Sequence, residues 1–221
     1  MPGRMVTVLF EDSDVLAVDK PDGLAVVPER DITRPCLVSM LAQQVPYKPY
    51  IVHRLDKEVS GVMLLAKNTE AHRYLNDQFG TRQVHKTYLA LVHGRMEPDP
   101  GTIDQPIRQF GSGRMGIDAE QGKPSVTKYK ILDLLPGYSL LEVHPITGRR
   151  HQIRVHLYSI GHPIVGDLYY GDKAVQKLFG RLMLHAFKVS FTTPSGEKRA
   201  IESPVPVSFQ QVLEALGHGP I

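Results

Sequence analysis

Hydrophobic and polar positions alternate in several short segments of this chain, and turn residues separate many of these segments. Such alternation is typical of β-strands. The strands expected on this ground are 7–10, 15–19, 62–66, 84–93, 126–135, 138–144, 182–193 and 198–202. The connections at 11–14 and 136–137 are short and rich in turn residues, so the strands on either side of each are expected to pair as hairpins.

Four other segments are expected to be helices: 35–45, 69–79, 150–160 and 207–216. Asn68 or Thr69 is placed to cap the second of these, and Gly80 is placed to end it. Residues 97–124 are rich in Gly and Pro and are expected to form a long loop. Because strands outnumber helices, we expect an α+β fold with a mixed, largely antiparallel sheet and flanking helices.

A chain of 221 residues, of which 42% are hydrophobic, is long enough for a packed core. We find no internal repeat or linker and expect a single domain over residues 1–221. No apolar stretch approaches the roughly 20 residues of a membrane span, and the N-terminus has no apolar signal segment. The single cysteine, Cys36, excludes an internal disulfide and fits a reducing cytoplasm, with its thiol packed within the helix 35–45.

The net charge is only +3, but the basic residues are concentrated in stretches without acids. Residues 80–96, 105–117 and 143–166 contain no Asp or Glu. The arginines and lysines of these stretches are Arg82, Lys86, Arg95, Arg108, Arg114, Arg149, Arg150 and Arg154. This distribution favours a positive surface that contacts phosphates, although acids from elsewhere in the fold could also neutralise it.

The segment His53-Arg54-Leu55-Asp56-Lys57-Glu58-Val59-Ser60-Gly61 places a carboxylate and a guanidinium two residues apart, just before the strand 62–66. The residues alone fit a charged turn equally well. The pattern His-Arg-Leu-Asp-x-x-x-Ser-Gly, however, resembles the catalytic signature of the RluA-type RNA pseudouridine synthases. The resemblance extends over about residues 9–204. It implies a long, bent mixed sheet with an RNA-binding cleft across its middle.

The resemblance implies that Asp56 is the nucleophile that converts uridine to pseudouridine. Its carboxylate could attack the sugar or the base, or remove a sugar proton, and it must be charged in each case. Arg154 lies in Gly148-Arg149-Arg150-His151-Gln152-Ile153-Arg154-Val155-His156, which resembles a second motif of the family. Helical geometry places Arg154 at the border of the buried stripe, from where it could keep Asp56 ionised. Tyr88 matches the active-site tyrosine, which could stack on the base or accept its proton.

The remaining candidates are substrate-binding residues. The resemblance implies that Arg54 fills the space of a flipped base, a role suited to a flat guanidinium. Leu184 matches an apolar wall of the uracil pocket, although ordinary strand packing explains it nearly as well. The polar residues expected to contact RNA are His53, Lys86, Arg149, Arg150 and His151.

Other parts of the chain also look like family segments, with a structural or RNA-contacting role. They are Lys20-Pro21-Asp22-Gly23-Leu24, Gly122-Lys123-Pro124-Ser125-Val126-Thr127-Lys128-Tyr129 and His162-Pro163-Ile164-Val165-Gly166-Asp167. Val59 departs from the usual Thr, which puts the hydrogen bonding of the Asp56 loop in doubt. Arg150 also stands where Thr is frequent. The N-terminal S4-type domain of many relatives is not expected here.

No cofactor and no metal are expected. The isomerisation needs neither a redox step nor an energy input. The Gly-rich segment 111–116 matches a dinucleotide fingerprint, but no expected strand precedes it. His151 and His156 lie five residues apart, which does not fit the helical spacing of a zinc site.

RNA is therefore the expected partner, as a stem-loop of tRNA or ribosomal RNA, and the protein is expected to act as a monomer. Two alternatives remain on sequence grounds. A non-catalytic RNA-binding or chaperone protein would need the basic stretches but not Asp56. A nucleosidase would use Asp56 but release free uracil.

Overall fold

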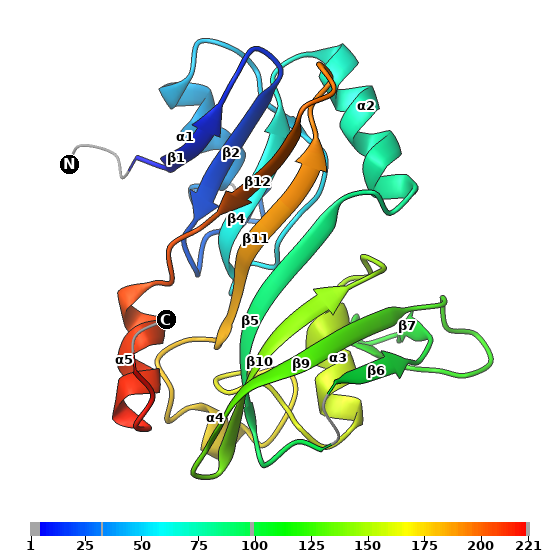
Figure 1. Ribbon diagram of the computed structural model, residues 1–221, viewed down its shortest axis with the longest axis vertical. Coiled ribbons are helices and arrows are strands. Elements are labelled where there is room, and N and C mark those ends of the chain that lie inside the picture. Colours follow the sequence, from blue (N-terminus) through cyan, green and yellow to red (C-terminus); the bar gives the residue numbers. More distant parts are fainter. Residues whose placement is uncertain (1–4, 32, 98–99, 220–221) are drawn as a thin grey trace. The chain divides into compact units, whose positions relative to one another are not determined.

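The computed structural model describes residues 5–31, 33–97 and 100–219, which form two compact units (Figure 1). Unit 1 contains the described residues up to Lys86 together with Ala186–Pro204. Unit 2 contains the described residues of Thr87–His185 and those from Val205 onward. Within these residues, no helix is both long and apolar enough to cross a membrane.

Unit 1 is built on a sheet with the strand order β1-β2-β4-β11, in which β2 pairs antiparallel with β1 and with β4. The strands β12 and β3 add antiparallel to β11 and β4. Its strands are β1 (Thr7–Glu11), β2 (Val15–Lys20), β3 (Tyr50–Ile51), β4 (Ser60–Ala66), β11 (Leu184–Thr192) and β12 (Lys198–Glu202). Its helices are α1 (Leu37–Gln44) and α2 (Thr69–Gly80). Helix α2 packs against β3 and β4, and Leu64 and Leu75 lie in the resulting core.

Unit 2 has the strand order β5-β10-β9-β6 and a separate hairpin of β7 and β8. Its strands are β5 (His85–His93), β6 (Gly101–Asp104), β7 (Ile107–Gln109), β8 (Met115–Ile117), β9 (Val126–Leu135) and β10 (Tyr138–Pro145). Its helices are α3 (Gln152–Ser159), α4 (Lys173–Gln176) and α5 (Val207–Ala215). Helix α3 contacts β8, β9 and β10 (Figure 1).

The predicted α+β class with a largely antiparallel sheet is confirmed, as are both hairpins. The helix predicted at 69–79 is confirmed, and Asn68 is its N-cap because its side chain accepts a hydrogen bond from the Ala71 N–H. Gly80 still belongs to this helix, whose C-cap is Thr81. Cys36 lies at the N-cap of α1 rather than inside it, and its thiol is buried.

Two predictions were wrong. Residues 97–124 are not one long loop, because β6, β7 and β8 lie within them. These strands have only three or four residues, too few to show an alternating pattern. Helix α3 is not amphipathic, since all of its residues from Gln152 to Leu157 are buried. Arg154 is therefore enclosed on all sides instead of lying at the border of a buried stripe.

Candidate active site

Asp56 lies in unit 1 on a tight turn directly before β4. The turn is closed by a backbone hydrogen bond from the Val59 N–H to the Asp56 carbonyl, at 3.1 Å. Leu55 and Val59 are buried on either side, whereas Asp56 itself is half-buried. Two apolar anchors thus fix the ends of the turn and hold the carboxylate near the surface. Val59 departs from the family pattern, but its backbone closes the turn and its side chain packs in the core.

Lys20, at the end of β2, holds the same turn through its buried side chain. Its side chain is fully buried, and its Nζ donates to the carbonyls of Pro21 and Leu24 at 2.8 Å and to that of Lys57 at 3.1 Å. Hydrogen bonds from a charged donor contribute about 1.5–3 kcal/mol each. The buried ammonium therefore ties the residue next to Asp56 to the loop after β2. The Lys20-Pro21 segment thus supports the Asp56 turn in this chain.

Gly61, the last residue of the motif, is required by a close approach of two strands. Its φ is 120°, and a Cβ at this position would lie 2.2 Å from the Ala186 carbonyl oxygen of β11. Any side chain would force the strands apart and would strain the backbone. The glycine thus allows β11 to lie directly against the strand that follows the Asp56 turn.

The His53 side chain is held inside unit 1. Its Nε2 accepts a hydrogen bond from the Leu64 N–H at 2.9 Å, and its ring stacks on Phe79 at a centroid distance of 4.7 Å. Burial, and secondly the Lys86 ammonium, lower the pKa of His53 to about 3. Burial also lowers the pKa of Lys86 to about 8. The neutral imidazole is thus held by a hydrogen bond and a stacking contact, and it stabilises the segment that carries Asp56. Contact of His53 with RNA stays a prediction.

This environment predicts a pH-dependent stability. The unfolded chain takes up a proton at His53 near pH 6.5, whereas the folded chain does so only near pH 3, so stability is lost as the pH falls through this window. Between pH 7 and pH 5 His53 alone should cost about 2 kcal/mol. Urea unfolding of wild type and His53→Gln across this range measures the effect, since Gln keeps the acceptor without titrating. Parallel pH curves for the two proteins would contradict this account.

Two candidates are residues of unit 2, although β11 continues from Leu184 into unit 1. Tyr88 is half-buried in β5, where it pairs with Val143 of β10. Leu184 is buried at the start of β11, 3% exposed. Both positions are compatible with the predicted stacking and wall-forming roles, which stay predictions.

The segment before α3 is organised by a buried glutamine. The Oε1 of Gln152 accepts hydrogen bonds from the Thr147 hydroxyl and the Arg149 N–H, and its Nε2 donates to the Val126 carbonyl and the Thr127 hydroxyl. His151 has a left-handed backbone with φ 55°, so the helix begins only at Gln152 and not at Arg150. As a result, Arg149 and Arg150 project into solvent, where their contact with RNA is possible.

Arg154 forms an ion pair that the sequence analysis did not identify. Its Nε and Nη2 each donate to a different oxygen of Asp167, both at 2.8 Å, and both side chains are at most 1% exposed. The backbone N–H groups of Tyr169 and Tyr170 also donate to Asp167. The guanidinium is therefore fixed in a single orientation. A family-like segment contained Asp167, but no sequence pattern indicated its partner.

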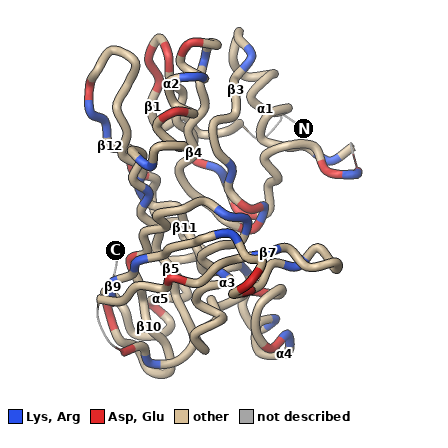
Figure 2. The backbone as a smooth tube through the Cα atoms, turned by 90° about the vertical axis from the view of Figure 1, so that its right-hand side faces the viewer, with Lys and Arg blue, Asp and Glu red and all other residues tan. Residues whose placement is uncertain are grey.

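The acid-free stretches are less uniformly positive in the fold than in the sequence. Lys and Arg occur along both units (Figure 2), and acids from outside the stretches neutralise some of them. Arg108 pairs with Asp118 at 2.8 Å, and Arg154 pairs with Asp167. Within the stretches, Arg82, Arg95, Arg114, Arg149 and Arg150 remain exposed, and Arg54 of the Asp56 motif is exposed as well. These arginines are the candidates for phosphate contact.

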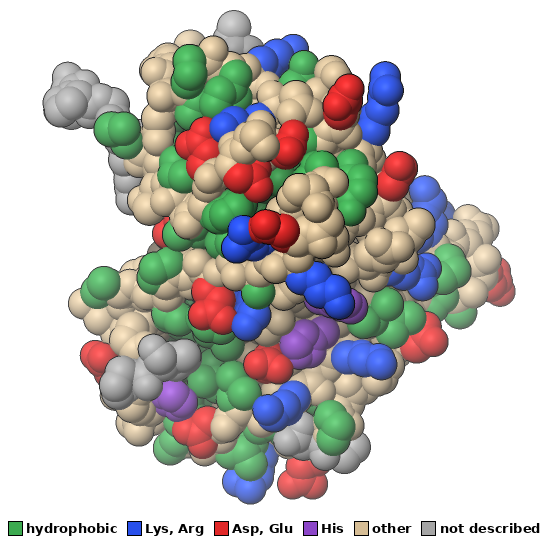
Figure 3. Space-filling model, turned by 45° about the horizontal axis from the view of Figure 1, so that its top comes forward, with side chains coloured by type: hydrophobic (Ala, Val, Ile, Leu, Met, Phe, Trp, Pro, Cys, Tyr) green, Lys and Arg blue, Asp and Glu red, His purple; other side chains and the backbone are tan. Residues whose placement is uncertain are grey.

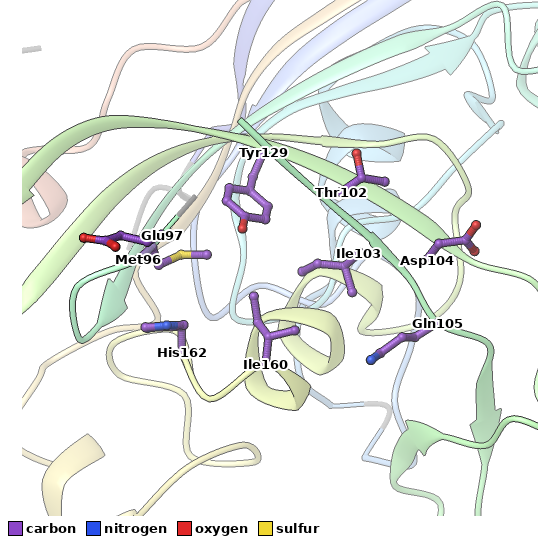
Figure 4. Close-up of a pocket in the computed structure, with 9 residues that line it drawn as sticks. All are labelled: Met96, Glu97, Thr102, Ile103, Asp104, Gln105, Tyr129, Ile160 and His162. Atoms are coloured by element: carbon purple, nitrogen blue, oxygen red, sulfur yellow. The ribbon is translucent and has the colours of Figure 1, made fainter. Parts of the chain in front are cut away.

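A hollow of about 470 Å³ in unit 2 lies apart from the predicted residues. Tyr129, Ile160 and His162 line it together with residues of β6 and the segment before it (Figure 4). Of its lining residues, Tyr129 ends the family-like segment 122–129 and His162 begins the family-like segment 162–167, and none belongs to the Asp56 motif or the Arg154 motif. Among the described residues, no group of three or more His, Cys, Asp or Glu side chains could hold a metal ion.

Comparison with known proteins gives consistent results. The family model described as "RNA pseudouridylate synthase" matches residues 14–159. An "Uncharacterized RNA pseudouridine synthase" of Aquifex aeolicus is 39% identical, over 96% of this chain and 73% of the relative. A "Ribosomal large subunit pseudouridine synthase D" of Nitrosomonas europaea is also 39% identical, over 96% and 66%. The solved structure "Human RNA Pseudouridylate Synthase Domain Containing 1" has a TM-score of 0.80 at 31% identity and covers 100% of this chain and 98% of its own.

Proposed function

Because this chain belongs to the RluA-type RNA pseudouridine synthases, isomerases that convert uridine in RNA to pseudouridine, we propose that Asp56 is its catalytic carboxylate. The observation that carries the proposal is the Asp56 turn. The half-buried carboxylate is held in place by the turn between the buried Leu55 and Val59 and by the Lys20 ammonium. The close approach of Gly61 to β11 fixes the strand that follows the turn.

The reaction breaks the bond between C1′ of the ribose and N1 of the base, and forms a bond between C1′ and C5. The base loses the proton at C5 and gains one at N1, so neither electrons nor cofactors are consumed. An ionised Asp56 serves by attacking C1′, by attacking the base, or by removing a ribose proton. Tyr88 is proposed to stack on the base and to accept the C5 proton. Leu184 is proposed to form an apolar wall of the uracil site.

Arg154 is proposed to keep Asp56 ionised. Three observations support this role: its position in the second motif, its complete burial, and its fixed orientation on Asp167. A guanidinium has five N–H donors, and the hydrogen bonds to Asp167 occupy two of them. The ion pair with Asp167 is thus compatible with a second carboxylate partner. Asp167 acts as a positioning residue in this scheme.

For the substrate, we propose a stem-loop of tRNA or of ribosomal RNA. A relative at 39% identity is named for the large ribosomal subunit, which favours ribosomal RNA. Arg149, Arg150, His151 and Lys86 are proposed to contact the RNA, with the enzyme acting as a cytoplasmic monomer without cofactor or metal.

Release of tritium tests the proposal directly. The purified protein is incubated with tRNA and ribosomal RNA labelled with tritium at C5 of uridine. Pseudouridine formation must release this tritium to water, and nuclease digestion must then yield pseudouridine. Free uracil among the products would instead indicate a nucleosidase, and RNA binding without tritium release would indicate a non-catalytic binder.

Arg54→Ala should separate base flipping from chemistry. Arg54 is exposed beside the Asp56 turn, and its guanidinium could fill the space of an extruded base. Unstacking a base costs a few kcal/mol, and Arg54 is proposed to offset part of this cost. Loss of the Arg54 side chain should therefore lower turnover about 10- to 100-fold on a stem. An unpaired strand of the same sequence should lose less than about 3-fold, because little unstacking is needed. Equal losses on the two RNAs would argue against the flipping role.

A further inference from the structure

Two tyrosine side chains of unit 2 are exposed to solvent instead of being packed in the core. Tyr158 on α3 and Tyr169 in the loop after Asp167 are 44% and 54% exposed. Arg114, in the turn between β7 and β8, is also exposed. On the face drawn in Figure 3, hydrophobic side chains reach the surface between charged ones. Exposed aromatic rings next to arginines are typical of surfaces that bind unpaired nucleic acid.

These side chains are connected by a continuous series of ring contacts. Tyr158 lies against Tyr170 at 6.0 Å between centroids, Tyr170 against His151 at 5.8 Å, and His151 against Tyr169 at 5.8 Å. The hydroxyl of the buried Tyr170 is 2.9 Å from Nδ1 of His151. Tyr170 and His151 therefore form a fixed base beneath the two exposed rings.

An arginine lies at each end of the series. The Arg114 guanidinium is 5.8 Å from the ring of Tyr158 and 5.2 Å from that of Tyr170. The buried Arg154 guanidinium is 5.2 Å from the ring of Tyr169 and 5.4 Å from that of Tyr170. The series thus runs without interruption from the proposed catalytic arginine to an exposed one. A guanidinium stacked on rings still presents its N–H edge to phosphate oxygens.

The positive charge of this region suits the phosphate groups of RNA. Tyr158 lies within the acid-free stretch 143–166, and Arg114 within the acid-free stretch 105–117. The acids that directly follow these two stretches in the chain are Asp118, which is paired with Arg108, and Asp167, which is paired with Arg154. The surface therefore combines π-faces with positive charge.

Resting on the proposed function, we propose that Tyr158, Tyr169 and Arg114 form a binding surface for unpaired nucleotides that flank the target uridine. The two tyrosines stack on bases, and Arg114 contacts a phosphate. We name these three residues the flanking-nucleotide surface. Stacking does not depend on base identity, so the surface contributes affinity and a preference for unpaired strands.

Fluorescence anisotropy with a short oligouridine and with an RNA duplex of equal length tests this assignment. All proteins carry Asp56→Asn, so that no RNA is converted during the measurement. Tyr158→Ala and Tyr169→Ala should each weaken oligouridine binding about 5- to 150-fold and change duplex binding less than about 3-fold. Tyr158→Phe and Tyr169→Phe should bind like the parent. Arg114→Gln should lower the salt dependence of oligouridine binding by about one phosphate contact.

Tyr74→Ala serves as the matched control, because Tyr74 is an exposed tyrosine of α2 outside the surface, and its loss should leave both affinities unchanged. Thermal unfolding confirms that each variant is folded. If the parent binds oligouridine and the tyrosine variants bind it equally well, the assignment is overturned. If the parent does not bind oligouridine, the assignment fails, and tritium release from labelled tRNA and ribosomal RNA decides separately whether the proposed function holds.

Discussion

Asp56→Asn is expected to lower pseudouridine formation by at least about four orders of magnitude. Removal of a nucleophile from other enzymes has costs of this size or larger, and four orders correspond to about 5.5 kcal/mol of transition-state stabilisation. Asn has the same shape as Asp but carries no charge, so it can neither attack nor remove a proton. RNA affinity should change only a few-fold, because the anchors Leu55 and Val59 and the turn between them are unchanged. Single-turnover kinetics with saturating enzyme separates the two effects.

Glu58→Gln is the matched control for this variant. Glu58 lies on the same turn, is half-buried, and loses one negative charge in the same way. Its activity should stay within a few-fold of wild type. Full activity of Asp56→Asn, or an equal loss in Glu58→Gln, would exclude Asp56 as the catalytic carboxylate.

The second large effect is expected at Arg154, as a loss of stability. Arg154→Ala leaves the Asp167 carboxylate buried with neither of its two guanidinium hydrogen bonds. Breaking a buried ion pair by removal of one partner typically costs about 3–5 kcal/mol. The free energy of unfolding in urea should fall by this amount, and activity should be lost as well.

Two further variants distinguish a broken ion pair from lost packing. Arg154→Met combined with Asp167→Leu removes both charges and should recover part of the stability, because apolar replacements of a buried pair are often neutral. The recovery is partial because the N–H groups of Tyr169 and Tyr170 lose their acceptor. Arg149→Ala, at an exposed position of the same segment, should change stability by less than about 0.5 kcal/mol. If Arg154→Ala were no less stable than Arg149→Ala, the ion pair between Arg154 and Asp167 would not contribute to the stability of the fold.

The sequence predicted those parts of the fold whose signal is local. The hairpin of β9 and β10 follows from two alternating segments and a Pro136-Gly137 turn, and helix α2 follows from its cap and its periodicity. The strands β6 to β8 were missed because three or four residues carry no period. The sequence predicts an amphipathic helix at α3 because an enclosed helix can still have hydrophobic residues at helical spacing. Its burial depends on β8, β9 and β10, which lie elsewhere in the chain.

In the candidate site, too, the residues with a local sequence signal could be predicted, whereas their long-range partners could not. The motifs select Asp56 and Arg154 as candidates through their order in the chain alone. The partners that hold these residues could not be predicted, because Lys20 reaches the Asp56 turn over 37 residues and Asp167 reaches Arg154 over 13. The ring series of Tyr158, Tyr170 and His151 likewise forms only when α3 and the loop after Asp167 are folded together.

Carbodiimide-based pseudouridine mapping of total tRNA and ribosomal RNA tests the central claim most directly. Cells with the gene, without it, and with the Asp56→Asn variant are compared. We predict at least one pseudouridine that is lost on deletion, restored by the wild-type gene and not restored by Asp56→Asn. An unchanged pattern in both RNA classes, or restoration by Asp56→Asn, would contradict the assignment of Asp56-dependent pseudouridine formation in these RNAs.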